Sequence, residues 1–244
     1  MTTEHLSLSH HPDQETAVRA AATALSAELS SLAQAHTPVL LLVSGGSALR
    51  ILDDVDPSGL GKLLTLGVLD ERYSSDPAVN NFHQLMQTRL YQTAQVSGAS
   101  LIDSRVQNNE TQADLRARLE QALRQWTATH PTGVIVITQG IGPDGHTSGV
   151  LPFPEDPGKF ATLFMDDAVW VAAYDASGKN PHPLRVTTTL SFLQQVHSSI
   201  LFACGVDKKV ALAATLAEAG ALAQTPARII RQMRRVQVFT DISD

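Results

Sequence analysis

A run of β-branched residues followed directly by a glycine-rich polar loop is the feature that most constrains this sequence. Residues 134–137 read VIVI, without polar alternation, and the segment TQGIGPDGHTSGVLP follows at residues 138–152. Unbroken apolar runs are typical of parallel strands buried on both faces, and open α/β sheets bind ligands where such strands end. The pattern therefore predicts a parallel sheet with a functional loop at its carboxyl edge.

The same succession of apolar run, turn and helical periodicity recurs along the chain. Further strands are expected at residues 39–43, 63–69, 168–174, 198–204 and 236–239. Helices are expected at residues 15–33, from 48, and at 80–91, 110–126, 188–195, 208–219 and 226–233. We interpret residues 153–160 and 178–187 as loops, the second stiffened by prolines. Because no linker or repeat interrupts the succession, residues 1–244 are predicted to form a single doubly wound α/β domain with a mainly parallel sheet.

Composition narrows the classes of partner and the compartment. The chain has 18 Lys and Arg against 24 Asp and Glu, a formal net charge of -6, which argues against nucleic acid or an anionic membrane as the main partner. Its single cysteine, Cys204, allows no disulfide within the chain, and no apolar run approaches the ~18 residues of a membrane span. With no basic and apolar signal at the N-terminus, we expect a cytoplasmic protein, a monomer or a small homo-oligomer.

The first expected strand ends in a turn suited to an anion. Residues 44–47 read SGGS, and a helical pattern begins at Ala48. Gly45 and Gly46 let backbone N–H groups turn toward a ligand, Ser47 adds a hydroxyl, and a helix N-terminus adds partial positive charge. The alternative is a tight turn that binds nothing. The Gly-Lys-Ser/Thr ending of a P-loop is missing.

Charged residues follow other expected strands. Asp70, Glu71 and Arg72 come directly after the strand at 63–69, although an acidic pair and its Arg commonly serve only as a cap and an ion pair. Arg185 lies in the proline-stiffened loop, and Lys208 lies in the first turn of its helix, where it opposes the helix dipole and an anion nearby would explain its position.

The loop at 138–152 presents a carboxylate and an imidazole, Asp144 and His146, next to the flexible backbones of Gly142 and Gly145. We interpret it as a catalytic loop; the alternative is a histidine that ties the loop together through hydrogen bonds. The spacing of residues 140–145 matches the dinucleotide fingerprint, but no helix opens on it. The scattered histidines lack metal-ligand spacing, so no metal or cofactor is expected.

Four blocks together resemble the 6-phosphogluconolactonases. They are SGGS at 44–47, LDER at 69–72 with Asp76, Asn80 and Asn81 behind it, GIGPDGHTSGVLP at 140–152, and RVT at 185–187. That group also includes glucosamine-6-phosphate deaminase, whose members resemble one another in DGHIAFNEP. The glutamate five residues after the histidine is Leu151 here, and Thr147 follows His146 as in the lactonase pattern DGHTASLFP. Residues 148–151 depart from that pattern in their small side chains.

The resemblance implies a phosphosugar lactone as ligand and hydrolysis of 6-phospho-D-glucono-1,5-lactone as the reaction. His146 is then the general base, oriented by Asp144 or by Asp70, and Arg72 stabilises the oxyanion or a ring hydroxyl. The residues expected to hold the phosphate are Gly45, Gly46, Ser47, Arg185 and Lys208.

Two alternatives to the lactonase stay open. A deaminase would need another carboxylate in place of Leu151, such as Glu155. A non-catalytic phosphosugar sensor would use the same cradle without chemistry, although the acidic chain shows no segment for a DNA-binding helix-turn-helix.

Overall fold

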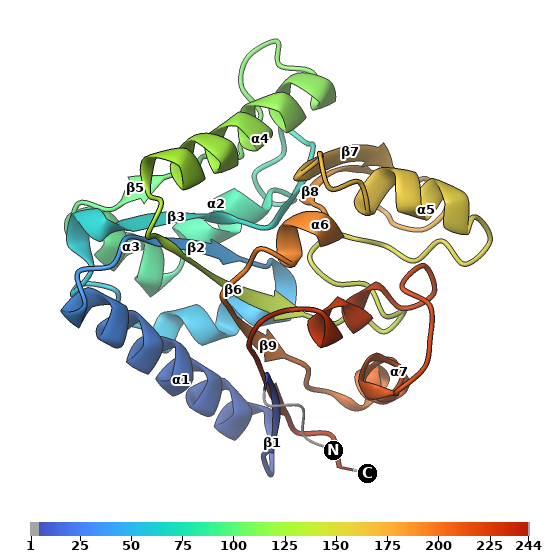
Figure 1. The fold of residues 1–244 in the computed structure, drawn as a ribbon, viewed down its shortest axis with the longest axis horizontal. Coiled ribbons are helices and arrows are strands. Elements are labelled where there is room, and N and C mark those ends of the chain that lie inside the picture. Colours follow the sequence, from blue (N-terminus) through green and yellow to red (C-terminus); the bar gives the residue numbers. More distant parts are fainter. Residues whose placement is uncertain (1–4, 244) are drawn as a thin grey trace.

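A computed structural model describes residues 5–243, which form a central sheet covered on both faces (Figure 1). Within these residues the sheet has seven strands, and each neighbouring pair is parallel. In spatial order they are β1 (Leu6–His10), β10 (Val236–Thr240), β9 (Ser198–Phe202), β6 (Val134–Gly140), β2 (Val39–Val43), β3 (Leu64–Val68) and β5 (Ser100–Leu101). The predicted α/β class with a mainly parallel sheet is confirmed.

A second, smaller sheet was not expected from the sequence. It has the order β4 (Asp70–Arg72), β8 (Leu184–Thr188) and β7 (Val171–Asp175), with antiparallel pairs. The prediction of a loop throughout 178–187 was therefore wrong, because Pro181 and Pro183 precede the strand and do not interrupt its ladder. Pairing of β4 with β8 places Arg72 opposite Arg185.

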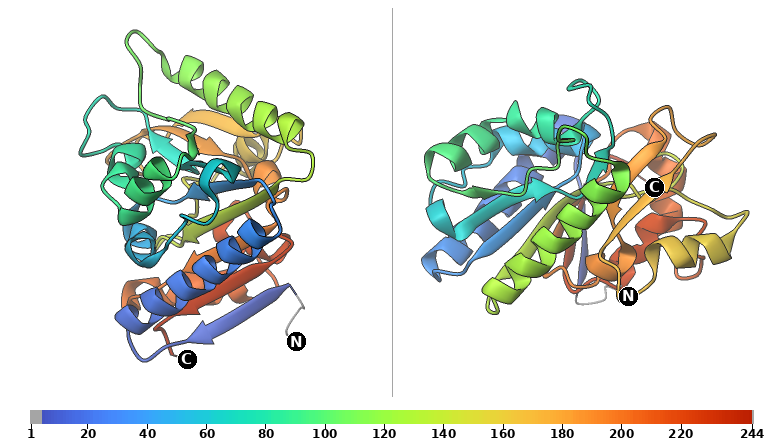
Figure 2. Two further views of the ribbon diagram at one scale, coloured as in Figure 1. Left: turned by 90° about the vertical axis from the view of Figure 1, so that its left-hand side faces the viewer. Right: turned by 90° about the horizontal axis from the view of Figure 1, so that it is seen from above.

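Helices of the first half of the chain cover one face of the large sheet (Figure 2). They are α1 (Gln14–Gln34), the 3₁₀ helix η1 (Gly46–Asp54), α2 (Asn81–Met86) and α3 (Arg89–Val96), with the short 3₁₀ turn η2 (Gly61–Leu63) before β3. The single helix expected at 80–91 is divided because the side chain of Thr88 caps α3. Leu41 of β2 faces this layer, whereas Leu40 and Leu42 face the other, as strand alternation requires.

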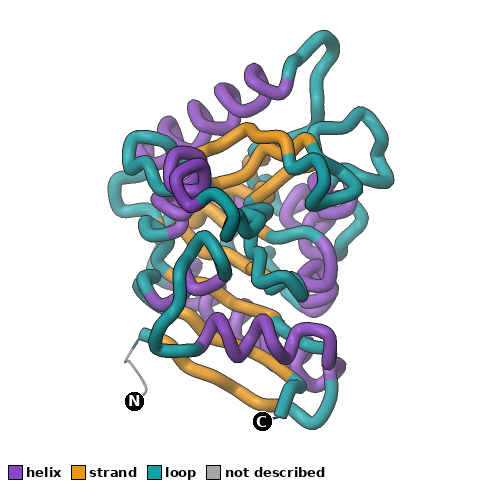
Figure 3. Tube along the Cα trace, turned by 90° about the vertical axis from the view of Figure 1, so that its right-hand side faces the viewer, coloured by secondary structure: helices purple, strands orange, loops and turns teal. Residues whose placement is uncertain are grey.

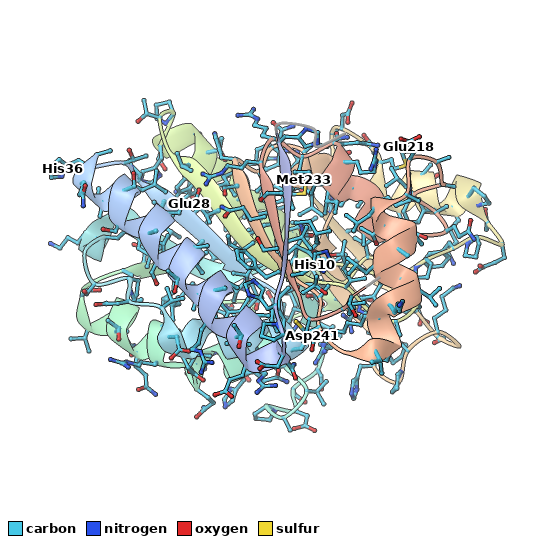
Figure 4. The ribbon with its side chains drawn as sticks, turned by 90° about the horizontal axis from the view of Figure 1, so that it is seen from below. His10, Glu28, His36, Glu218, Met233 and Asp241 are labelled. Atoms are coloured by element: carbon cyan, nitrogen blue, oxygen red, sulfur yellow. The ribbon has the colours of Figure 1, made fainter. Side chains whose placement is uncertain are left out.

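The other face is covered by the small sheet and the remaining helices (Figure 3). These are α4 (Gln112–Thr129), α5 (Pro157–Phe164), α6 (Leu190–Leu193), the 3₁₀ turn η3 (Val206–Lys208), α7 (Lys209–Leu216) and η4 (Pro226–Arg231). Helix α5 begins inside the segment expected to be a loop. Asp156 caps it, Pro157 opens it, and Phe160 and Phe164 bury one face four residues apart. In Figure 4, α1 and α7 lie on opposite sides of the edge strand β1.

The order of the strands creates a crevice between β2 and β6. From β2 the chain continues to β3 on one side, while β6, β9 and β10 lie on the other. Ligands of open α/β sheets bind at such a reversal, outside the carboxyl ends of the strands. The loops after β2, β3, β6 and β9 all begin at this edge. No helix within residues 5–243 combines the length and apolar character needed to cross a bilayer.

Candidate active site

A pocket of about 220 Å³ opens at the carboxyl ends of β2 and β6. Asn81, Ser148 and Gly149 line part of its wall. The predicted site residues that line it are Gly45, Gly46, Ser47, Asp70, Arg72, His146, Arg185 and Lys208. The fold thus brings together groups that are widely separated in the sequence, and Asp144, the remaining predicted residue, contacts His146.

Asp144 and His146 form a hydrogen-bonded pair. His146 Nδ1 lies 2.5 Å from Asp144 Oδ1, and the same oxygen accepts the backbone N–H of His146 at 3.1 Å. Burial by itself would raise the pKa of Asp144, but the hydrogen bond from His146 holds that pKa below its usual value. An ionised carboxylate can only accept, so Nδ1 carries the proton in neutral His146 and Nε2 has a free lone pair. The arrangement suits a general base.

The turn after His146 is fixed from the small sheet. Ser148 and Gly149 both have left-handed backbones, with φ of 49° and 74°. Tyr174 on β7 donates its hydroxyl to the carbonyl of Gly149 at 2.6 Å, and Thr187 on β8 donates its hydroxyl to the carbonyl of Ser148. These two bonds offset the strain of the turn and join the loop that carries His146 to the sheet that carries Arg185.

Asp70 and Arg185 form a buried ion pair in the pocket wall. Arg185 Nη2 lies 2.6 Å from Asp70 Oδ2, and each residue is 5% exposed. Gly149 makes this pair fit, because a Cβ at that position would lie 2.4 Å from Asp70 Cβ. Asp70 therefore faces Arg185, and the carboxylate that contacts His146 is that of Asp144.

The turn after β2 has the form of an anion cradle. Helix η1 begins at Gly46, whose φ is 69°, and the first N–H groups of a helix have no partner within it. Lys208, which is 9% exposed at the start of α7, reaches across to donate from Nζ to Ser47 Oγ at 3.0 Å. Gly45 has no room for a side chain, since a Cβ there would lie 2.2 Å from Asn81 Oδ1.

Positive charge predominates in the pocket. Arg72 is half-buried and donates from Nη1 to the carbonyl of Val79 at 2.9 Å, while its Nε has no partner among the described residues. Arg72, Arg185 and Lys208 face one charged carboxylate among the lining residues, that of Asp70. This balance favours an anionic ligand such as a phosphate ester.

A larger hollow elsewhere lacks that chemistry. A hollow of about 420 Å³ lies beside the end of α1, where Asp56 is the charged side chain among its lining residues. In residues 5–243 no cluster of three or more His, Cys, Asp or Glu side chains could hold a metal ion.

Asn81 is a lining residue to which the sequence assigned no role. Its Nδ2 donates to the carbonyl of Asp70 at 2.9 Å, and its Oδ1, which lies beside Gly45, has no partner among the residues described. The sequence signal was its place in the block behind LDER, but only the fold shows that it bridges the cradle and β4.

The position that distinguishes the deaminase pattern holds no carboxylate. Leu151 is buried in the apolar core beside the small sheet. Glu155 is exposed, pairs with Lys179 at 2.5 Å, and does not line the pocket.

Comparison with known proteins identifies the family. The family model described as "Glucosamine-6-phosphate isomerases/6-phosphogluconolactonase" matches residues 12–239. The chain belongs to this family. Within it, the human 6-phosphogluconolactonase is 30% identical over 190 residues, which cover 74% of this chain and 69% of the human protein. The bovine 6-phosphogluconolactonase is 31% identical over 195 residues, with 74% and 69% covered.

Solved structures agree with this family assignment at the level of the fold. The 6-phosphogluconolactonase from Shewanella baltica OS155 superimposes with a TM-score of 0.73 at 19% identity, covering 98% of this chain and 97% of that one. The enzyme from Trypanosoma brucei gives a TM-score of 0.69 at 19% identity, with 96% and 95% covered. The resemblance read from the four sequence blocks is therefore confirmed, and so is the fold that it implied.

Proposed function

We propose that the protein hydrolyses 6-phospho-D-glucono-1,5-lactone to 6-phospho-D-gluconate. The observation that carries the proposal is the meeting of the His146–Asp144 pair with the anion cradle in one pocket of about 220 Å³. A lactone is an activated ester, so the reaction needs a positioned water, a base and charge stabilisation. The names of the relatives in the family support this choice of substrate.

In the proposed mechanism His146 acts as general base. Its Nε2 takes a proton from water as the water oxygen bonds to the lactone carbonyl carbon. Asp144 keeps the other ring nitrogen protonated and stabilises the imidazolium that forms. The ring C–O bond then breaks, and the proton passes from Nε2 to the departing ring oxygen. No covalent bond to the protein is needed.

The other polar and charged groups of the pocket are assigned to the two ends of the substrate, its phosphate and its lactone carbonyl. The N–H groups at the start of η1, with Ser47 and Lys208, form the phosphate end of the pocket in this proposal. Arg72 serves the carbonyl oxygen, where negative charge develops during attack. Arg185 contributes positive charge to the phosphate end while its ion pair with Asp70 keeps it in place.

The first test is the rate at which freshly generated lactone disappears, compared with its spontaneous hydrolysis. Wild-type protein should accelerate the reaction, and His146→Ala should lower kcat by about 10²–10⁴ because the base is lost. Affinity for 6-phosphogluconate should be retained, since the cradle is unchanged.

A histidine far from the pocket provides the matched control. His36 lies at the far end of α1 (Figure 4) and has a φ of 52°, which asparagine tolerates, so His36→Asn should hydrolyse the lactone like the wild type. An unchanged kcat in His146→Ala would remove His146 from the mechanism. Binding of 6-phosphogluconate without any acceleration by the wild type would favour a phosphosugar sensor.

A further inference from the structure

Glu71 is a fully buried carboxylate between two residues of the pocket wall. It lies on β4 between Asp70 and Arg72, and it has no exposed surface. Its Oε1 accepts the backbone N–H groups of Arg72 at 2.8 Å and Asn81 at 2.6 Å. Oε2 accepts further hydrogen bonds from Phe82 N at 3.0 Å and Ser104 Oγ at 2.8 Å. The mechanism proposed above does not use it.

These four hydrogen bonds join three segments of the chain behind the pocket. Strand β4 carries Arg72, the first turn of α2 carries Asn81, and the loop after β5 carries Ser104. Arg72 and Asn81 both line the pocket. The side chain of Asn81 lies against Gly45, so a shift of α2 would also move the wall of the anion cradle.

We infer that Glu71 is a positioning residue, which holds Arg72 and Asn81 where they meet the lactone. The inference rests on the proposed function and adds to it a residue that never touches the substrate. Glu71 acts through the backbone of Arg72 and through the start of α2, and so sets the direction from which the guanidinium approaches.

The four hydrogen-bond donors around Glu71 explain why this residue is a glutamate. Three of the four partners are backbone N–H groups, which can only donate, and a carboxylate accepts at both oxygens. A glutamine would turn an amide NH₂ group toward donors. Among the residues described, no Lys, Arg or His forms an ion pair with Glu71, so neutralisation of a cation is not its role.

A double-mutant cycle tests the inference. In a protein that stays folded at the assay temperature, Glu71→Gln should lower kcat/KM by about 10–100-fold, since misplacing a reacting group by an ångström costs on this order. Because Glu71 acts partly through Arg72, Glu71→Gln should lower kcat/KM by a smaller factor in the Arg72→Ala background than in the wild type. Glu155→Gln makes the same chemical change at an exposed site and should leave kcat/KM unchanged.

Two outcomes would overturn the inference: an unchanged kcat/KM in folded Glu71→Gln, or losses that multiply in the double variant. Should Glu71→Gln not fold, Ser104→Ala removes one of the four donors and should lower kcat/KM about two- to fivefold; no change would count against the inference.

Binding of 6-phosphogluconate, measured by calorimetry, separates this inference from the proposed function. If the wild type does not hydrolyse the lactone, the function fails, yet Glu71→Gln should still bind 6-phosphogluconate at least about fivefold more weakly than the wild type. Equal affinity would then reject the positioning role.

Discussion

Close contacts near His146 decide which position of the loop must be glycine. A Cβ at Gly142 would lie 2.1 Å from His146 Nδ1 and 2.7 Å from Asp144 Oδ1. A Cβ at Gly158, on α5, would have its nearest heavy atom at 3.5 Å, an ordinary contact. The two glycines therefore differ in what they tolerate, although the sequence gives no sign of the difference.

We predict that Gly142→Ala damages activity and that Gly158→Ala, outside the pocket, does not. The added methyl group at 142 must push the imidazole away from Asp144, so kcat should fall by about tenfold or more. Lactone hydrolysis by the two variants, with circular dichroism to verify folding, provides the measurement. Equal rates in both variants would show that the imidazole relaxes without cost.

Most residues proposed from the sequence line one pocket, but the sequence did not show how they pair. The glycine turns and the DGHT block carry local signals, so His146 and the cradle could be predicted. The ion pair of Asp70 with Arg185 depends on the register of two strands far apart in the sequence, which no local pattern encodes. Which carboxylate contacts His146 was left open for the same reason.

Elements were predicted best where periodicity was long. Helix α1 and strands β2, β6 and β9 lie within a few residues of their expected bounds, because a long amphipathic pattern or an unbroken apolar run is a strong signal. The sequence predicted a strand at 168–174, where β7 lies, but it missed α5, the strands β4 and β8 of the small sheet, and the edge strands β1 and β5. A two-turn helix and a three-residue strand bury too few residues to produce a period, and their stability depends on tertiary contacts.

Arg228 on η4 fastens the chain that follows α7. It is 6% exposed, and its guanidinium donates to the carbonyls of Ala214 at 2.6 Å, Gly220 at 3.1 Å and Glu218 at 3.2 Å. The N–H of Ala227, also on η4, donates to the carbonyl of Gly145, next to His146. Arg228 thus connects the helix that follows Lys208 with the loop that carries His146.

Replacing Arg228 by Met should lower the free energy of unfolding by about 2–4 kcal/mol. The aliphatic volume is largely kept, but three part-buried hydrogen bonds are lost, at about 0.5–1.5 kcal/mol each. Urea titration of the variant gives the value. Arg234→Met, at an exposed position, should change stability by less than about 0.5 kcal/mol. A similar small loss for Arg228→Met would mean that the segment after α7 is held by packing.

On the scale of the whole molecule, two apolar layers share the strands of one sheet. Alternate residues of β2 belong to the layer under α1 and to the layer under the small sheet. Loss of either layer would therefore expose strands that the other needs. This sharing supports our proposal that residues 1–244 act as a single domain, for which coincident unfolding by fluorescence and circular dichroism is the measure.

The stability of the whole molecule should depend on the protonation of Glu71. Burial raises its pKa from 4.5 to about 7, against the opposing effect of its hydrogen-bond donors. The four donors favour the ionised form, which accepts at both oxygens, but burial opposes it more strongly. The raised pKa means that ionisation of Glu71 is harder in the folded protein than in the unfolded chain. The contribution of Glu71 to the free energy of unfolding is therefore fully present below about pH 4.5 and is lost as the pH rises to about 7.

The predicted observable is the difference in unfolding free energy between wild type and Glu71→Gln. As the pH rises from 4.5 to 8, the wild type should lose roughly 3 kcal/mol of unfolding free energy relative to Glu71→Gln, because glutamine does not ionise. Urea titrations at several pH values provide it. A difference independent of pH would place the pKa of Glu71 near that of an ordinary carboxyl.

Strand β1 pairs along its whole length with β10, the last strand of the described chain, from Leu6 opposite Val236 to His10 opposite Thr240. During synthesis on the ribosome, β1 therefore emerges long before its partner exists. Helix α1 also emerges long before strands against which it packs, β9 and β10. Loop closure over such separations is slow, and an unpaired strand edge invites pairing with another chain. The nascent chain is most exposed to aggregation in the interval before β10 emerges to pair with β1.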